Sequence, residues 1–333
     1  MTSLITGGTG FIGERLLAQL SVRGETVRVL CRNPQPAPQS AGAQPEQFAG
    51  NVLDPCSIAH AMEGCDRVYH LAGYAHGWSR TPATYFTVNV EGTRNILEAA
   101  RKAGVRKVVC TSTVMTIGPS NGSPSSESTL RRVPMLTVYE QSKIAEELLA
   151  LQYAGTGLDV VVVNPTRVFG PGMLNEGNSA TRMIKLYIEG LWRIVPGDGD
   201  AEGNYAFVED VARGHILAME HGRSGERYIL GGENVSYNAF FAAVSRAAGR
   251  RRVLLHVPGP VAIASAYGDE FRARLFRGYP SITPGWAKTF LLNNAYSTRK
   301  AETELGYRVT PLQEALEVTI AWLRNKAAQG GRR

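Results

Sequence analysis

The chain has 333 residues, 44% of them hydrophobic and 20% charged, an ordinary composition for a globular protein with a large core. Its formal net charge of +7 comes from scattered residues, and no continuous basic stripe interleaved with aromatics predicts a nucleic-acid partner. No apolar run approaches the length of a membrane-spanning helix, and the four cysteines lack metal-site spacing. We therefore expect a cytoplasmic protein with reduced cysteines, no metal, and no nucleic-acid or membrane partner.

A glycine-rich turn follows the first predicted strand, at residues 3–6. Gly7 suits the tight turn, Gly10 allows a pyrophosphate to approach the backbone, and Gly13 allows the next helix to pack close to the strand. The helical pattern that follows places N-terminal N–H groups and a partial positive charge at the same point. This arrangement predicts a dinucleotide-binding site at the beginning of the chain.

Short apolar runs alternate with helical patterns through the first half of the chain. The predicted strands span residues 3–6, 26–30, 46–49, 67–71, 107–111 and 159–163, and the clearest helices span 85–103 and 139–154. The runs lack period-2 alternation, as in strands buried on both faces of a sheet. The pattern predicts an α/β protein with a doubly wound, parallel Rossmann sheet.

Glycine and proline become frequent after Pro165, and the pattern changes there. We assign residues 1–165 to a dinucleotide-binding Rossmann domain, to which 204–232 return, and residues 166–203 and 233–333 mostly to a smaller C-terminal substrate lobe. Further helices are predicted at 180–189, 207–220, 236–248 and 311–325, and further strands at 226–230 and 252–256. Residues 32–45 and 118–134 are rich in loop-forming residues and are predicted to be loops.

The end of the second predicted strand bears on the choice of cofactor. In dinucleotide-binding sheets an acidic residue there binds the adenosine ribose, whereas an arginine accommodates a 2′-phosphate. Cys31, Arg32 and Asn33 follow residues 26–30, so no acid is present and a guanidinium is in position. The sequence favours NADP(H) as the cofactor and leaves NAD(H) as the alternative.

Tyr139 and Lys143 lie four residues apart in a helical pattern and therefore share a face of that helix. A lysine ammonium lowers the pKa of a nearby phenol from about 10, and such a tyrosine can donate a proton to a carbonyl oxygen or accept one from a hydroxyl. The fifth predicted strand ends in Thr111, Ser112 and Thr113, and the carboxyl ends of parallel strands face the ligand crevice. A hydroxyl from this run could hydrogen-bond the same substrate oxygen.

Further motifs accompany these three features along nearly the whole chain. They are Thr6-Gly-Gly-Thr-Gly-Phe-Ile-Gly13, Gly50-Asn-Val-Leu-Asp54, His70-Leu-Ala-Gly73, Asn89-Val-Glu-Gly-Thr-Arg-Asn95, Tyr139-x-x-x-Lys143, Asn164-Pro165 and Phe207-Val-Glu-Asp-Val-Ala212. With them the chain resembles the extended short-chain dehydrogenase/reductases, the NAD-dependent epimerase/dehydratase group. It is most similar to the dihydroflavonol 4-reductase-like and hopanoid-associated epimerase-like members.

The resemblance implies that Thr113, Tyr139 and Lys143 form the catalytic triad, with a threonine in place of the commoner serine. It also implies a cofactor site made of residues around the pyrophosphate, the adenine and the cofactor's centre. These residues are Gly7, Gly10, Phe11, Ile12, Gly13, Arg32, Asn51, Val52, Leu71, Ala72, Gly73, Tyr139, Lys143 and Pro165. Asn51 stands where the family usually has an aspartate, so the adenine contact departs from the family pattern.

Two details favour a reductase within this group. The Asn164-Pro165 pair is similar to that of the reductase members, whereas nucleotide-sugar epimerases more often have an Arg-Tyr/Phe-x-Asn pattern there. Val114 and Met115 follow Thr113, where nucleotide-sugar 4,6-dehydratases have an Asp-Glu pair, so elimination by that route is not expected. We expect an NADPH-dependent reductase that converts a ketone to a secondary alcohol, with Tyr139 as general acid.

Other functions stay open at this level. A nucleotide-sugar epimerase would hold NAD tightly and would have an acid at the end of the second strand, and a non-catalytic dinucleotide sensor would not need the triad. We expect a small-molecule substrate, with a preference for a ketone on an apolar or aromatic skeleton. Candidates for its contacts are Tyr74, His76, Trp78, Met173, Tyr187, Trp192 and Phe207. The resemblance favours a homodimer packed through the helices at 85–103 and 139–154.

Overall fold

The computed structural model describes residues 1–34 and 45–330. Within these ranges, seven strands form one parallel sheet in the order β10-β6-β5-β4-β1-β2-β3. The strands are β1 (Thr2–Thr6), β2 (Thr26–Cys31), β3 (Glu46–Ala49), β4 (Arg67–His70), β5 (Lys107–Thr111), β6 (Asp159–Pro165) and β10 (Arg227–Leu230). The predicted doubly wound Rossmann sheet is confirmed, and the order reverses between β1 and β4, where such sheets bind their ligands.

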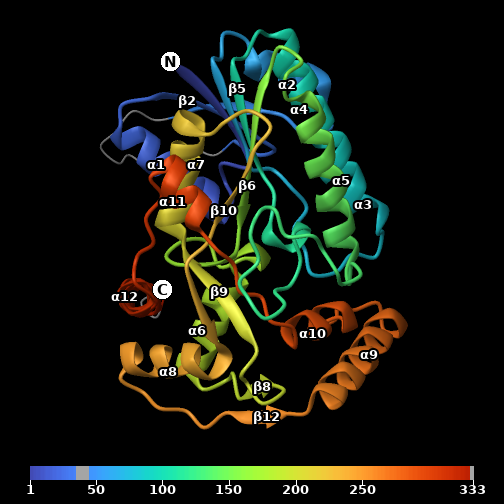
Figure 1. Ribbon diagram of the computed structural model, residues 1–333, viewed down its shortest axis with the longest axis vertical. Coiled ribbons are helices and arrows are strands. Elements are labelled where there is room, and N and C mark those ends of the chain that lie inside the picture. The colour runs from blue at the N-terminus through green and yellow to red at the C-terminus, as the bar shows by residue number, and fades with distance from the viewer. Residues whose placement is uncertain (35–44, 331–333) are drawn as a thin grey trace.

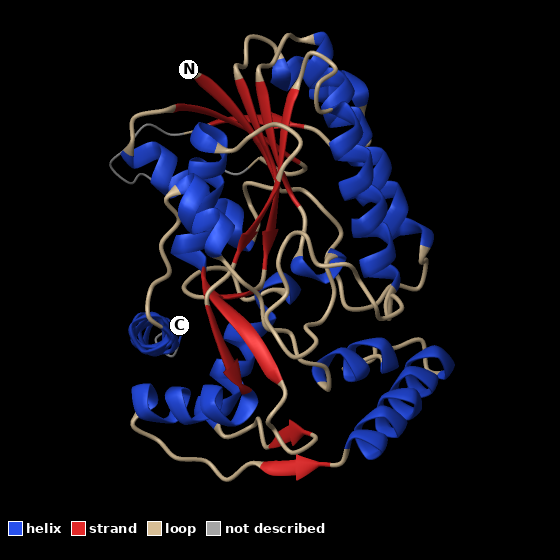
Figure 2. Ribbon diagram, in the orientation of Figure 1, coloured by secondary structure: helices blue, strands red, loops and turns tan. Residues whose placement is uncertain are grey.

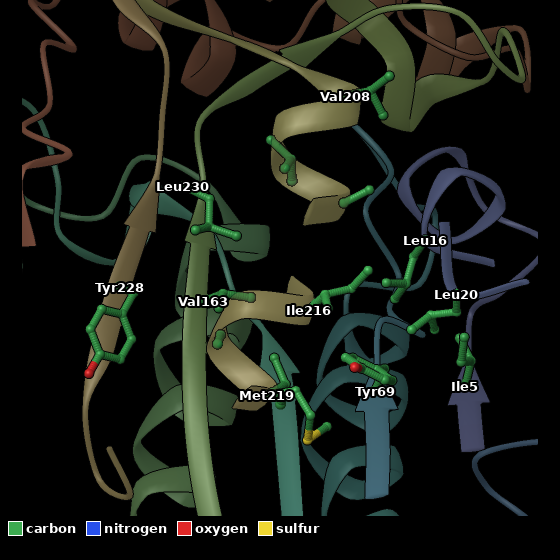
Figure 3. Packing of buried hydrophobic residues seen from close by; sticks show 14 of the residues in the cluster. Ile5, Leu16, Leu20, Tyr69, Val163, Val208, Ile216, Met219, Tyr228 and Leu230 are labelled. Carbon is green, nitrogen blue, oxygen red and sulfur yellow. The ribbon is translucent and has the colours of Figure 1, made fainter. Parts of the chain in front are cut away.

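Helices cover both faces of this sheet (Figure 1, Figure 2). They are α1 (Phe11–Val22), α2 (Pro55–Met62), α3 (Ala83–Phe86), the π-helical turn η1 (Thr87–Glu91), α4 (Gly92–Lys102), α5 (Val138–Tyr153), α7 (Val208–His221) and α11 (Arg299–Leu305). Leu16 and Leu20 of α1 and Ile216 of α7 pack on one face against Ile5 and Tyr69 (Figure 3). Burial of each such aliphatic side chain contributes about 1.5–3 kcal/mol.

The remaining elements form a second lobe below the carboxyl ends of the strands (Figure 1). Its strands are β7 (Arg167–Phe169), β8 (Ile194–Pro196), β9 (Glu202–Phe207), β11 (Glu233–Ser236) and β12 (Leu255–Val257). Its helices are η3 (Glu176–Asn178), α6 (Ser179–Glu189), α8 (Tyr237–Ala248), α9 (Gly259–Leu275), α10 (Pro284–Phe290) and α12 (Leu312–Gly330). In the part of the chain that the structure describes, no helix is both long and apolar enough to cross a bilayer.

Several predicted elements differ from those observed. The helix predicted at 85–103 is divided into α3, η1 and α4, because the π-helical turn widens the helix around the buried Asn89. Helix α9 is absent from the prediction because Ala266 and Ala273 are its buried residues, so it has no apolar stripe of large side chains. The strand predicted at 252–256 is shorter, Leu255–Val257. Most of the loop predicted at 32–45 lies outside the described residues.

Candidate functional site

The glycine-rich turn forms a cradle between β1 and α1. Gly7 has a φ of +74°, and a Cβ atom there would lie 2.6 Å from the Ala72 nitrogen. A Cβ atom on Gly13 would lie 2.2 Å from the Gly7 carbonyl oxygen, so only glycine allows α1 to pack this closely. Gly10 caps α1 without a side-chain hydrogen bond, which leaves the first N–H groups of the helix available to an anion. The cradle therefore fits a pyrophosphate.

A cleft of about 420 Å³ joins this cradle to the second lobe. Ten of the predicted cofactor residues line it, together with Thr113. The ten are Gly7, Gly10, Phe11, Ile12, Gly13, Leu71, Gly73, Tyr139, Lys143 and Pro165. The structure thus brings together the turn after β1, the beginning of α1, the segment after β4, the beginning of α5 and the end of β6, which are far apart in the sequence.

Four predicted cofactor residues do not line this cleft. Arg32 is exposed just beyond β2. The Asn51 side-chain oxygen accepts a hydrogen bond from the Leu53 nitrogen at 3.1 Å, and Val52 is buried. Ala72 donates its N–H to the Thr6 hydroxyl at 3.3 Å, which holds the segment after β4 against β1.

Tyr139 lies in the first turn of α5, at the wall of the cleft. The helix begins with a capping box, in which Thr137 and Glu140 satisfy each other's backbone N–H groups. Glu140 also pairs with Arg131 at 2.9 Å, and Arg131 donates to the Met115 carbonyl oxygen at 2.5 Å. Arg131 thereby ties the segment after Thr113 to the beginning of the helix that carries Tyr139.

Thr113 and Tyr139 line the cleft side by side, and the Thr113 hydroxyl is near enough to the phenol to favour a lower pKa of Tyr139. Lys143, one turn along α5, donates to the Thr111 carbonyl oxygen at 2.9 Å and is buried. Burial raises the pKa of Tyr139, Lys143 lowers it in part, and Glu146 raises it further, so the net pKa is above its ordinary value. The expectation that Lys143 brings the phenol pKa down is therefore wrong in net effect, because desolvation and Glu146 outweigh the ammonium.

Glu146 is a buried carboxylate that sequence reasoning missed. It lies 2.5 Å from the Lys143 ammonium, and burial raises its pKa to about 7 although Lys143 opposes this shift. Behind it lies Thr93, which favours a lower pKa of Glu146 and whose hydroxyl lies 2.9 Å from His70 Nε2. The spacing of three residues from Lys143 on one helix was the available sequence signal.

Glu147 occupies a second buried position behind Thr113. It accepts hydrogen bonds from the Ser112 hydroxyl at 2.5 Å and from the Asn164 amide at 2.8 Å, and it pairs with Arg227 at 2.8 Å. Asn164 also donates to the Thr113 carbonyl oxygen at 3.1 Å. This network fixes the backbone of Thr113 from behind, and it explains the asparagine of the Asn-Pro pair at the end of β6.

Aromatic rings from both lobes lie close to Tyr139. Trp286 of α10 stacks on it with ring centroids 6.4 Å apart, and Tyr85 lies at 6.4 Å. Trp286 in turn lies 6.5 Å from Phe290. A cleft with such walls suits a flat apolar skeleton, since aromatic faces contribute contact area at low conformational cost.

The residues suggested for substrate contact fall into two groups. Tyr74 and His76 line the cleft, and their tilted rings have centroids 4.4 Å apart. Trp78 is not among the lining residues and packs edge-on against Tyr279 at 5.4 Å. The four candidates of the second lobe do not line the cleft: Tyr187 and Phe207 are buried in the core, Trp192 packs against it, and Met173 is exposed.

Comparison with known proteins identifies the family. Residues 3–231 match the model of the NAD dependent epimerase/dehydratase family. The chain belongs to this family. A protein from Synechocystis sp. provisionally named dihydroflavonol 4-reductase is 32% identical over 327 residues, covering 96% of this chain and 94% of the relative. Sterol demethylase protein B from Methylococcus capsulatus is 32% identical over 332 residues, covering 98% of this chain and 99% of the relative.

Solved structures of family members have the same fold. The protein gox2253, known from a crystal structure, is 32% identical in sequence to this chain, and the two structures match over 98% of each chain with a TM-score of 0.83. The Thermus thermophilus UDP-glucose 4-epimerase, solved with NAD, is 26% identical with a TM-score of 0.76, matched over 97% of this chain and 99% of the epimerase. This protein is accordingly an extended short-chain dehydrogenase/reductase of a family that uses nicotinamide cofactors, and both reductases and epimerases are among its relatives.

Proposed function

We propose that this protein is an NADPH-dependent ketoreductase that converts a ketone to a secondary alcohol. The observation that carries the proposal is the placement of Thr113 beside Tyr139 at the wall of the cleft that Gly10 and Lys143 also line. Both hydroxyls can therefore reach one substrate oxygen next to the site of a dinucleotide. The buried Val114 and the apolar Met115 that follow Thr113 supply no acid or base for an elimination.

In this proposal the nicotinamide cofactor, when bound, supplies the hydride. Gly7, Gly10 and the N-terminus of α1 hold its pyrophosphate, and Lys143 binds its ribose. Thr113 orients the substrate carbonyl, and Tyr139 donates its phenolic proton to the carbonyl oxygen. The raised pKa of Tyr139 keeps the phenol protonated at neutral pH, which is the state that a reduction requires. A positioned acid of this kind contributes on the order of 10²–10⁴ in rate.

The preference for NADPH rests on the end of β2. Arg32 is exposed there, and neither Cys31 nor Asn33 offers a carboxylate to the ribose hydroxyls. A guanidinium binds a 2′-phosphate through two parallel hydrogen bonds. Titration of the purified protein with NADPH and NADH should give tighter binding of NADPH. Equal binding, or NAD retained through purification with no consumption of NADPH, would favour the epimerase instead.

Tyr139→Phe tests the assigned general acid. We expect the variant to bind NADPH like the wild type and to lose at least 100-fold in kcat, because the ring stays and the acidic proton is removed. The assay follows nicotinamide absorbance with a panel of aryl ketones. Tyr153→Phe on the same helix is the matched control, since its hydroxyl bonds Glu98 outside the cleft. Near-normal turnover in Tyr139→Phe would contradict the assignment.

We also propose a homodimer packed through α3, η1, α4 and α5. Two large apolar side chains on these helices support it, because Leu148 is 59% exposed and Phe86 is 39% exposed. Light scattering should give a mass near twice 36.1 kDa, and Leu148→Glu should shift the mass toward the monomer. A wild-type monomer at micromolar concentration would contradict the proposed dimer.

A further inference from the structure

Arg167 at the beginning of β7 lines the same cleft as Tyr139. Its guanidinium lies over three aromatic rings, with its central carbon 5.7 Å from the Tyr205 centroid, 5.2 Å from Tyr237 and 5.4 Å from Phe290. It donates one hydrogen bond, to the Tyr205 hydroxyl at 3.3 Å. Among the side chains that the structure describes, which leave out that of Glu176, no carboxylate lies within ion-pair distance of it.

A guanidinium in such surroundings has unused binding capacity. It is always charged and has five N–H donors, of which the Tyr205 hydroxyl uses one. Desolvated cations in proteins are normally paired with an anion, and the aromatic faces replace only part of the lost hydration. The described cleft residues include two further basic side chains, His76 and Lys143. Lys143 already has Glu146 as its ion-pair partner. Among the described side chains, Arg167 is therefore the cleft cation for which no carboxylate partner is seen.

A continuous aromatic wall connects Arg167 to Tyr139. Trp286 lies 6.4 Å from Tyr139, Phe290 lies 6.5 Å from Trp286, and the guanidinium lies 5.4 Å from Phe290. A ligand with its carbonyl at Tyr139 could lie along Trp286 and Phe290 and end at Arg167. The wall fits a flat apolar skeleton, and its end fits an anion.

We propose that Arg167 binds the carboxylate of the substrate, and that the substrate is a ketone with a flat apolar skeleton and a carboxylate at its far end. This inference rests on the proposed reductase function for the position of the carbonyl. A carboxylate matches a single guanidinium, which can bind it through two parallel hydrogen bonds. A nucleotide diphosphate carries more charge than the one free guanidinium of the described cleft would neutralise.

The test measures binding, so that it does not depend on turnover. The probes are 4′-acetylbiphenyl-4-carboxylate and the corresponding carboxamide, titrated calorimetrically into the protein with saturating NADP⁺. We expect the wild type to bind the carboxylate at least 10-fold more tightly than the carboxamide. Arg167→Gln should remove this preference, and Arg167→Lys, which keeps the charge without the planar fork, should retain part of it.

Arg252→Gln is the matched control, because Arg252 is another arginine of the second lobe, bonded to the Ile188 carbonyl oxygen and outside the cleft lining. It should keep the full preference. The assignment is overturned if the wild type shows no preference for the carboxylate, or if the folded Arg167→Gln variant keeps it. It is also overturned if UDP binds to the wild type and Arg167→Gln weakens UDP binding, because this arginine would then bind a diphosphate. Failure of Tyr139→Phe to lose turnover would instead contradict the reductase proposal alone.

Discussion

Glu146→Gln removes one buried negative charge beside Lys143 and keeps the size of the side chain. Glu146 raises the pKa of Tyr139, so its removal should lower that pKa. The two residues are seven positions apart on α5, about 10 Å by helical rise. With an effective dielectric constant of about 20, their interaction is about 1.7 kcal/mol, which corresponds to roughly one pKa unit.

The assay is the pH dependence of kcat/KM for ketone reduction from about pH 7 to the highest pH at which the protein stays folded, about 11, because the pKa of Tyr139 lies above its ordinary value of about 10. Reduction requires protonated Tyr139, so activity falls as the pH rises through the pKa of Tyr139, and the fall should begin about one pH unit lower in the variant. Well below this pKa the two proteins should converge, because the phenol of Tyr139 is protonated in both. Glu189→Gln is the matched control, since it removes the same charge from the exposed pair with Lys185 at 2.9 Å. An unchanged or upward-shifted limb in Glu146→Gln would refute the reasoning.

Two further predictions concern the cradle and the core. Gly13→Ala should weaken NADPH binding at least 10-fold and lower the free energy of unfolding by about 1–3 kcal/mol, because its Cβ would lie 2.2 Å from the Gly7 oxygen. Titrations measure the binding and urea melts the stability. Gly268→Ala is the control: position 268 has open space around it, so this variant should neither weaken binding nor lower stability. Burial lowers the pKa of His215 to about 4 from an ordinary 6.5, so its contribution to stability is complete above pH 6.5 and falls as the pH drops toward 4. As the pH falls across this window, the free energy of unfolding of His215→Gln in urea melts should therefore decrease by about 1 kcal/mol less per pH unit than that of the wild type. The same pH dependence in both proteins would contradict this prediction.

The sequence contains the information for the sheet and for the cradle because both depend on local patterns. The apolar runs predict strands within one or two residues, and the glycine spacing is required by contacts such as that between Gly13 and Gly7, six residues apart. Tyr139 and Lys143 could be paired from their spacing alone, since they share a helix.

The walls of the cleft could not be predicted in the same way. Trp286 and Tyr139 are 147 residues apart in the sequence, and Arg167 and Phe290 are 123 residues apart. Only the packing of the second lobe brings each pair together. The sequence pattern also could not predict the net pKa of Tyr139, because that pKa depends on burial and on Glu146 as well as on Lys143. Helix α9, with small buried residues and exposed Phe271, lacks the periodicity that identifies amphipathic helices.

The order of strands in the larger sheet has a consequence for synthesis on the ribosome. β6 ends at Pro165, but β10, which pairs with it, begins at Arg227. Translation at about 5–20 residues per second takes on the order of 3–12 s to cover the intervening chain. During that interval the nascent sheet ends in an edge strand rich in valine, Val160 to Val163, whose backbone groups on the side away from β5 are open to other chains. We expect this interval, before the last strand emerges, to be the time at which the growing polypeptide most needs chaperones.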